Sequence, residues 1–373
     1  MAILPSNTNP ARLLLYAAKN PIIIAKGALG TNVQTLQGIL YQKLDDGSFS
    51  IPLNANNPLI AERETIQFHF NVSPILATAF PEPILLPNNV NYRKRVKAVQ
   101  EFCLKTRDYN NAGEAEIEEH FFAINAFLGT MQPNDFFSMT GSQQFNGLLT
   151  QSPLIKKTSL NTQEYLSLLI NLSPIPTKIK LVLTYKTTVK NTVTVLEISE
   201  NIADYDVYDF DVSPKTLPIQ DLNLDYYELQ FINQDNKPMS AKFMYIIRQQ
   251  IEQNYSSIVF VNSLGSFETF DFHGYTEQNR DNASETFTDS NYVRKKYYNE
   301  ITQKIKLRTD PLLRFWKNYL VRELDSSQAI FWRIGEKLYP IINISNSLKN
   351  DDELETEETL EIEFEIAQKE IIQ

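Results

Sequence analysis

Apolar and polar residues alternate with a period of two along much of the chain, which is the pattern of half-buried β-strands. β-branched and aromatic residues fill these segments, and turn-forming residues such as Asp46 and Gly47 divide them. Short strands divided by turns predict antiparallel β-sandwiches or barrels rather than βαβ units. Seven segments show the pattern: 20–28, 36–44, 65–72, 179–188, 191–198, 226–233 and 256–262.

One segment, 310–324, has helical periodicity instead. Asp310 stands where an N-cap belongs, and Pro311 suits the first helical position. Alternating segments precede and follow it, which predicts one helix packed on an antiparallel sheet. Apolar side chains recur on one face of this helix at three- and four-residue spacing: Leu312, Phe315, Trp316, Tyr319 and Leu320.

These patterns divide the chain into three units. We expect a mainly β protein with a β-sandwich at 1–120, a second β-sandwich at 121–275 and a small α+β unit at 276–373. Both sandwiches are expected to be antiparallel and Ig-like. The segments 129–150 and 274–291 are polar and lack periodicity, so they predict long loops that become ordered on contacting a neighbour.

Composition and charge narrow the class of protein. Of the 373 residues, 42% are hydrophobic and 21% are charged, which is an ordinary globular composition. The formal net charge of −10 argues against specific nucleic-acid binding, and the short basic run at 93–97 is expected to form local salt bridges. No apolar stretch approaches the ~20 residues that span a membrane. The first twenty residues also lack the pattern of a signal peptide.

Candidate catalytic and metal-binding residues are few. Cys103 is the only cysteine, so no intrachain disulfide can form, and we interpret it as a small buried side chain rather than a nucleophile. The three histidines, His69, His120 and His273, show no metal-ligand spacing. Phosphate-binding glycine motifs and the nucleophile-elbow motif are absent from the sequence. We therefore predict no catalytic residue, no cofactor and no metal, and so a protein that is not an enzyme.

Two polar stretches have residue types that also occur in cation-binding or catalytic sites. We interpret both as structural elements. Asp204, Asp206, Asp209 and Asp211 resemble the Asp-x-Asp pairs of divalent-cation sites, but alternate aspartates are also expected on a half-exposed strand. The stretch FVNSLGSFETFDFHG, residues 260–274, places an Asp and a His two positions apart. Its Asn-Ser-Leu-Gly-Ser centre has the residue types of a tight turn, so we predict a β-hairpin rather than a catalytic corner.

This hairpin resembles the N-S-L-G-G-aromatic-acid-T-aromatic hairpin of virion proteins encoded by tailed phages and prophages of Bacteroidetes-type bacteria. Other parts look like segments of the same proteins: KNPIIIAKG with QFHFNVSPILATAF, LIKKTSLNTQEYLSLLIN, and the C-terminal strand–helix–strands unit. Ser266 stands where that pattern has a second Gly. The resemblance implies a structural part of the tail, baseplate or neck, and it implies no catalytic residue.

We therefore expect a non-enzymatic virion protein, assembled in the host cytoplasm, that forms a symmetric homo-oligomeric ring and contacts neighbouring virion proteins. Ring subunits need exposed strand edges that pair with neighbours. No membrane insertion is expected. The expected interface residues are large apolar side chains: Phe270, Phe272, Leu312, Phe315, Trp316, Tyr319 and Trp332.

The alternative is a carbohydrate-binding or host-recognition module of the same β-sandwich class. Exposed rings of Tyr226, Tyr227 and Trp332 would then stack on the sugars of a host glycan. A hydrolase ranks third, because no local motif supports one.

Overall fold

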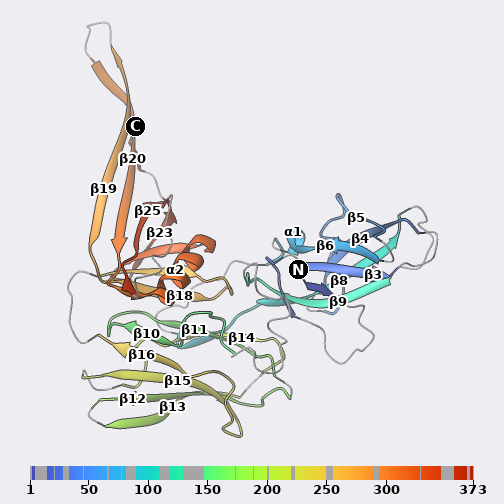
Figure 1. Cartoon of the computed structure of the whole chain (residues 1–373), viewed down its shortest axis with the longest axis horizontal. Coiled ribbons are helices and arrows are strands. Elements are labelled where there is room, and N and C mark those ends of the chain that lie inside the picture. Colours follow the sequence, from blue (N-terminus) through green and yellow to red (C-terminus); the bar gives the residue numbers. More distant parts are fainter. Residues whose placement is uncertain are drawn as a thin grey trace.

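The computed structural model shows a mainly β chain, as the alternation predicts (Figure 1). The described residues form six sheets and two helices, α1 (Ser73–Leu76) and α2 (Arg314–Ser326). Neither helix in this part of the chain is long and apolar enough to cross a membrane. The structure describes residues 2–4, 15–20, 22–27, 33–44, 46–64, 67–76, 78–80, 90–109, 117–128, 147–172, 174–187, 189–199, 201–219, 223–248, 255–288, 294–327, 329–345, 357–367 and 370–372.

The N-terminal part of the chain forms two sheets around one core. The three-stranded sheet has the order β1 (Ala2–Leu4), β3 (Ile22–Gly27), β6 (Gln67–Asn71). The five-stranded sheet has the order β2 (Leu15–Ala17), β9 (Ile117–Ile124), β8 (Val99–Asp108), β4 (Thr35–Gln42), β5 (Leu59–Glu62). Phe68 and Phe70 of the first sheet pack with Leu40, Phe102 and Phe121 of the second, so alternate residues of each strand face the core.

The middle part repeats this plan with its own core. Its three-stranded sheet has the order β11 (Tyr165–Leu169), β14 (Val207–Asp211), β7 (Tyr92–Lys94). Its five-stranded sheet has the order β10 (Ile155–Thr158), β16 (Phe243–Ile247), β15 (Tyr226–Asn233), β12 (Ile179–Lys186), β13 (Lys190–Ile198). Phe210 packs on Phe231 between the two sheets, with ring centroids 4.6 Å apart. Because β7 comes from the first 120 residues, the first two parts of the chain share a sheet.

The C-terminal part is one large antiparallel sheet with α2 packed on it. Its strand order is β18 (Phe267–Phe272), β17 (Ser256–Val261), β22 (Ile330–Ile334), β23 (Lys337–Asn343), β25 (Glu361–Ile366), β20 (Arg294–Arg308), β19 (Thr276–Thr288), with β26 (Glu370–Ile372) also paired to β20. Tyr319, Leu320 and Leu324 of α2 share a core with Phe260 and Ile362 of the sheet. The expected boundary at residue 275 would assign β17 and β18 to the middle part, whereas β17 pairs with β22 and β18 pairs with β17, so both belong to the C-terminal sheet.

The prediction of a loop at 274–291 is wrong over most of its length, because residues 276–288 form β19. This strand pairs with β20 along its whole length, and the hairpin extends away from the body of the sheet (Figure 1). The described side chains at 276–281 are exposed. A strand exposed on both faces needs no apolar alternation, which is why periodicity did not reveal it. Of the other expected loop, 129–146 lies outside the described residues.

The helix begins three residues later than the sequence predicts. Leu312 and Leu313 form a short strand, β21 (Leu312–Leu313), paired with β24 (Glu357–Glu358), and Leu313 is the N-cap without a side-chain cap. The Asp310 carboxylate pairs with the Arg248 guanidinium instead of capping the helix. Strand pairing and this ion pair therefore replace the expected cap.

The expectation of purely antiparallel sheets is wrong at three positions. β1 pairs with β3, β2 with β9, and β10 with β16 in the parallel sense. Each strand of these pairs reaches its partner through a connection too long for a hairpin, or from a distant part of the chain, and only such connections allow parallel pairing. Turn signals between successive strands carry no information about these partners.

Candidate functional site

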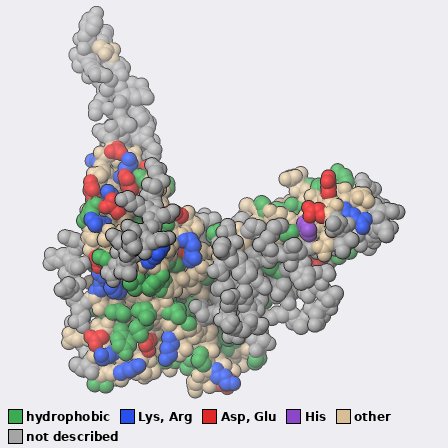
Figure 2. Space-filling model, in the orientation of Figure 1, with side chains coloured by type: hydrophobic (Ala, Val, Ile, Leu, Met, Phe, Trp, Pro, Cys, Tyr) green, Lys and Arg blue, Asp and Glu red, His purple; other side chains and the backbone are tan. Residues whose placement is uncertain are grey.

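An apolar pocket of about 310 Å³ lies where β10 and β16 approach the chain entering α2. Ile155 and Ile246 line it from the middle part, and Leu313, Phe315 and Trp316 line it from the C-terminal part. Three of these side chains are unusually open: Ile155 is 54% exposed, Phe315 52% and Leu313 46%. Hydrophobic side chains gather over this region in Figure 2. A cluster of large exposed apolar side chains is typical of a binding surface.

The expected interface residues divide into two groups. Phe270, Leu312, Phe315 and Trp316 line this pocket. Phe270 is largely buried and forms part of its wall, and its ring centroid lies 6.3 Å from that of Trp316. The other three are buried in the core beneath α2 and are not available to a partner: Phe272, Tyr319 and Trp332.

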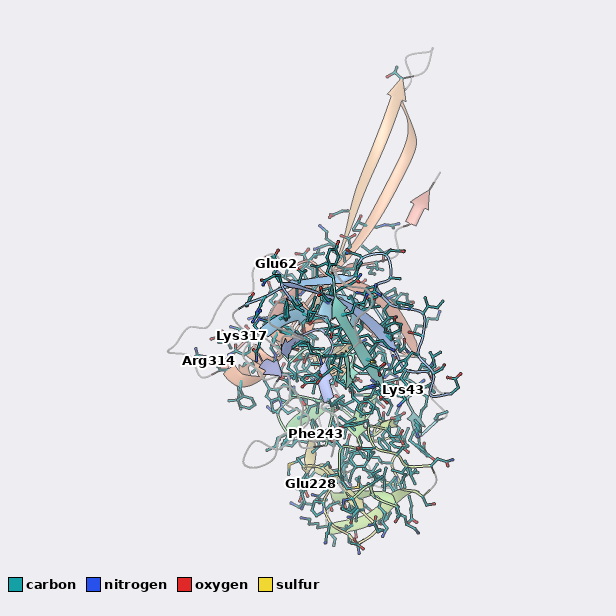
Figure 3. The ribbon with its side chains drawn as sticks, turned by 90° about the vertical axis from the view of Figure 1, so that its right-hand side faces the viewer. Lys43, Glu62, Glu228, Phe243, Arg314 and Lys317 are labelled. Atoms are coloured by element: carbon teal, nitrogen blue, oxygen red, sulfur yellow. The ribbon has the colours of Figure 1, made fainter. Side chains whose placement is uncertain are left out.

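The pocket lies where two elements reverse the usual placement of apolar and charged side chains. On β10, Ile155 is exposed while Lys156 is buried. On α2, Phe315 is exposed, while Lys317 is buried and pairs with Glu358. Lys317 is labelled in Figure 3. Burial of a lysine costs free energy unless it is paired, and both lysines are paired, Lys156 with Glu164 and Lys317 with Glu358. We missed Ile155 from the sequence because alternation alone would place it inside.

Three basic residues, Lys156, Lys157 and Arg248, are among those that line the pocket. Lys157 on β10 is exposed, and Arg248 follows β16 and pairs with Asp310. Lys156 points the other way, where its ammonium donates to Glu164 and to the Thr269 carbonyl oxygen, 2.6 Å away. Two of the three basic side chains at the pocket are therefore paired within the chain, Lys156 with Glu164 and Arg248 with Asp310.

The β-hairpin predicted at residues 260–274 is confirmed, and its turn is built by hydrogen bonds. β17 and β18 pair antiparallel, and the Asn262 side-chain oxygen accepts from the backbone N–H groups of Leu264 (3.0 Å) and Ser266 (2.8 Å). Gly265 has φ +75°, the left-handed conformation that favours glycine. Ser266, which stands where the resembling pattern has Gly, places its hydroxyl 2.6 Å from that of Ser167.

The hairpin joins the three parts of the chain through buried polar side chains. Glu323 of α2 accepts hydrogen bonds from the backbone N–H of Ser263 (2.5 Å) and from its hydroxyl (3.0 Å). The Phe127 N–H donates to the Ser263 carbonyl oxygen. The buried and half-buried polar groups around this turn form a cluster that we call the polar joint. Its members are Arg95, Thr150, Lys156, Thr162, Glu164, Ser167, Asp209, Asn262, Ser263, Glu268, Asp271 and Glu323.

Asp271 belongs to the polar joint, where it holds two segments together. Its two carboxylate oxygens accept from the hydroxyls of Ser257 and Thr162, each at 2.5 Å. His273 stacks on Tyr255, with ring centroids 5.4 Å apart. The Asp–His pattern of the hairpin therefore sits in a structural network between β17, β18 and the loop before β11.

The basic run at 93–97 forms local salt bridges, as predicted. Arg95 Nε lies 3.0 Å from Asp209 Oδ2, and its Nη1 donates to the Gly265 carbonyl oxygen at 2.6 Å. Lys94 pairs with Asp206 at 2.7 Å. Two of the four aspartates at 204–211 thus hold basic side chains of β7 and the residue after it, which supports the structural interpretation of that stretch.

Other candidate groups are poorly placed for chemistry. Burial raises the pKa of the Cys103 thiol to about 11, so it is protonated at neutral pH and is a weak nucleophile. Tyr227 and Trp332 are buried in the middle and C-terminal cores, so neither presents a ring face to a sugar. Of the three aromatic residues proposed for glycan stacking, only Tyr226 is partly exposed. No protein-family model and no curated protein matches the sequence.

Glu164 in the polar joint is expected to make stability depend on pH. Burial raises the pKa of its carboxyl to about 7 from the ordinary 4.5, against the opposing effect of the Lys156 ammonium. As pH rises, the Glu164 carboxyl therefore loses its proton at a lower pH in the unfolded chain than in the folded one. The contribution of Glu164 to stability is therefore fully present below about pH 4.5 and is lost as pH approaches 7, a difference of about 3 kcal/mol.

Thermal unfolding measured at several pH values tests this. The unfolding midpoint of the wild-type chain should fall between pH 4.5 and 7 more steeply than that of E164Q, whatever the absolute stability of the variant. Glu228 on β15 is half-buried in the same part of the chain, so E228Q serves as the matched control and should keep the wild-type slope. Parallel profiles for wild type and E164Q would contradict the assignment.

Proposed function

We propose that this protein is a non-enzymatic structural component of a phage virion, in the tail, baseplate or neck, which assembles as a symmetric ring. On this proposal the two-sheet N-terminal and middle parts are Ig-like modules, and the C-terminal sheet with α2 carries the contact to the next subunit. The resemblance of the 260–274 hairpin and of the C-terminal segments to virion proteins supports this class of protein. The pocket supports the mode of assembly.

The reversed placement of side chains at the pocket is the observation that carries the proposal. Ile155, Leu313 and Phe315 are held at the surface by elements whose buried faces include paired lysines. Covering exposed apolar groups of this size with a partner lowers the free energy of the complex, by about 25 cal/mol for each Å² removed from water. We assign the pocket as the contact to a second copy of the chain.

Sheet edges offer a second kind of contact. β13 ends the five-stranded sheet of the middle part, and β19 ends the large C-terminal sheet. The exposed side chains of β13 include Val193, and those of β19 at 276–281 are polar. Edge strands have unpaired backbone groups that can hydrogen-bond to a strand of a neighbouring subunit. In a ring, each subunit would use one such edge, or the pocket, against a different surface of the next subunit.

The polar joint suits a part that transmits force. Arg95, Glu268 and Glu323 tie the hairpin to the N-terminal part, the middle part and α2. Buried hydrogen bonds to charged groups are directional, so they fix the orientation of one unit on another more strictly than apolar packing alone. A rigid subunit loses little conformational entropy when it joins an assembly.

The expected result is that wild-type protein forms a closed oligomer of defined mass and that F315E does not. A carboxylate at position 315 would be desolvated in the contact, which should raise the dissociation constant by about 100-fold, or ~2.7 kcal/mol. Light scattering over a range of concentrations measures the mass of the oligomer and its dissociation constant, and negative-stain imaging shows whether the oligomer is closed. Ile51 is 83% exposed on the N-terminal part, so I51E is the matched control and should assemble like wild type.

A monomeric wild-type protein at every concentration would contradict self-assembly. Unchanged assembly of F315E would show that copies meet elsewhere, and the same measurement on V193E would then test the β13 edge.

A further inference from the structure

The outer face of the five-stranded N-terminal sheet brings together side chains that the sequence keeps apart. Cys103 on β8 lies directly opposite His120 on β9. Glu118 precedes His120 by two positions and Glu101 precedes Cys103 by two, so all four side chains project from the same face. The even-numbered residues of β8, such as Phe102, face the core instead. The prediction of no metal site rested on spacing along the chain, which does not register such cross-strand neighbours.

One ligand atom from each of Cys103, Glu118 and His120 lies within 4.8 Å of the other two. Zinc bonds to sulfur, nitrogen and oxygen are about 2.0–2.3 Å long, which places the ligands of a tetrahedral site about 3.4–3.8 Å apart. His120 Nε2 is already 3.4 Å from Glu118 Oε2. Side-chain rotations that move the ligand atoms by about an ångström would bring all three into bonding distance of one ion.

Both carboxylates near His120 are held in place by lysines. Glu118 accepts from Lys105 through Oε1, 2.7 Å away, and turns Oε2 to His120. Glu101 accepts from Lys43 through Oε2 at 2.7 Å, and its Oε1 lies 3.3 Å from His120 Nδ1 (Lys43 is labelled in Figure 3). Each glutamate therefore keeps one oxygen on a lysine and directs the other toward the imidazole.

This arrangement separates the two nitrogens of His120 into two tasks. With Nδ1–H donating to Glu101, the neutral tautomer leaves the Nε2 lone pair directed at the space next to Glu118. Metal-binding histidines commonly donate their second N–H to a carboxylate, which fixes the ring and raises its basicity. The ring also packs against Phe49, with centroids 5.7 Å apart, so its orientation is restricted.

We propose that Cys103, Glu118 and His120 form a binding site for a divalent transition metal of the zinc class, with Glu101 as a positioning residue. A thiolate, an imidazole and a carboxylate are the ligands that zinc and cobalt accept in tetrahedral sites, whereas magnesium and calcium prefer oxygen ligands alone. Binding exchanges the thiol proton of Cys103 for the ion. A fourth ligand would have to come from water or from a neighbouring molecule.

Cobalt(II) titration of the full-length, metal-stripped protein tests the proposal. We expect saturable binding of one ion per chain, with a near-ultraviolet thiolate-to-cobalt charge-transfer band and visible bands of tetrahedral cobalt. Because the chain has one cysteine, that band reports on Cys103 alone. Zinc should displace the cobalt and abolish the bands, and zinc should also raise the thermal unfolding midpoint of the wild-type protein.

Variants separate the site from unspecific binding. H120Q, at a half-exposed position, should weaken cobalt binding at least 10-fold and remove the stabilisation by zinc. E101Q should weaken binding about 10-fold while keeping the charge-transfer band, as expected for a positioning residue. His69 also contacts a glutamate, Glu64, at 3.0 Å on the same part of the chain, so H69Q is the matched control and should bind like wild type.

Two outcomes would overturn the proposal. One is the absence of a charge-transfer band in folded wild-type protein titrated with cobalt. The other is a band whose affinity is unchanged in H120Q. Neither outcome depends on the folding of a Cys103 variant, and neither bears on assembly through the Phe315 pocket.

Discussion

Replacing Glu268 with alanine is expected to lower the free energy of unfolding of the C-terminal part by about 3 kcal/mol. Glu268 is buried in the polar joint, and its Oε1 accepts from the Thr150 hydroxyl (2.5 Å) and the Asn262 amide (2.6 Å). Its Oε2 accepts from the Tyr319 hydroxyl at 2.5 Å. Alanine would leave these three donors without an acceptor in a site that water does not reach, and each buried donor left unsatisfied costs about 1–3 kcal/mol.

Replacing Glu268 with glutamine should lower the free energy of unfolding much less, by about 1 kcal/mol. Burial raises the pKa of the Glu268 carboxyl, so the site already disfavours its charge. An amide of the same shape keeps an acceptor for Thr150 and Asn262, and the Tyr319 hydroxyl can accept from its NH2 group. The expected order of stability is therefore wild type, then E268Q, then E268A.

Chemical denaturation followed by tryptophan fluorescence measures this order. Both tryptophans of the chain, Trp316 and Trp332, belong to or pack against the core under α2, so their emission reports on the C-terminal part. Glu336 is exposed in the turn between β22 and β23, and E336A is the matched control. Equal loss of stability in E268A and E336A would show that the hydrogen bonds of Glu268 contribute nothing.

Replacing Gly265 with alanine is also expected to lower the free energy of unfolding by about 3 kcal/mol. Gly265 has φ +75°, and a Cβ added there would lie 2.5 Å from the Asn125 carbonyl oxygen, which belongs to the backbone and cannot rotate away. Alanine therefore adds a steric clash to the strain of a left-handed conformation. Relief of the clash would move the turn away from the N-terminal part and weaken the hydrogen bond from Arg95 to the Gly265 carbonyl oxygen.

Gly335 provides the control for this clash. It has φ +60°, but a Cβ added there would meet no atom within 4 Å. G335A should therefore show the conformational strain alone, about 1 kcal/mol. The difference between G265A and G335A, measured in the same denaturation experiment, isolates the close approach of the hairpin to Asn125. Equal effects of the two substitutions would mean that the turn accommodates a side chain, contrary to the packing described here.

Local features of the fold could be predicted where short-range patterns determine them. Alternation located strands such as β12 and β17, and the Asn262–Gly265 turn marked the β17–β18 hairpin, because strand and turn preferences act over a few residues. The same reasoning failed for β19, which pairs with β20 and whose described side chains at 276–281 are polar and exposed. It also misplaced the start of α2, because the pairing of Leu312 with β24 depends on residues 46 positions away.

The candidate site was predicted only in part, for a similar reason. Helical spacing predicts Phe315 and Trp316 as interface residues, but it does not distinguish them from Tyr319, which α2 places in the core. Ile155 was not chosen, because alternation places an isoleucine inside and the neighbouring Lys156 outside. The reverse arrangement exists because Glu164 comes from another segment to pair with Lys156.

By itself, the sequence determined that this protein is mainly β, with one long helix near its C-terminus and a hairpin at residues 260–274, since these features follow from periodicity and local conformational preference. Only the tertiary structure decided which strands pair across long connections and which apolar side chains remain exposed. It also decided which polar groups meet, as Cys103 and His120 do across β8 and β9. Such neighbours depend on the register and packing of distant segments, which the free energy of the whole fold selects and no short stretch encodes.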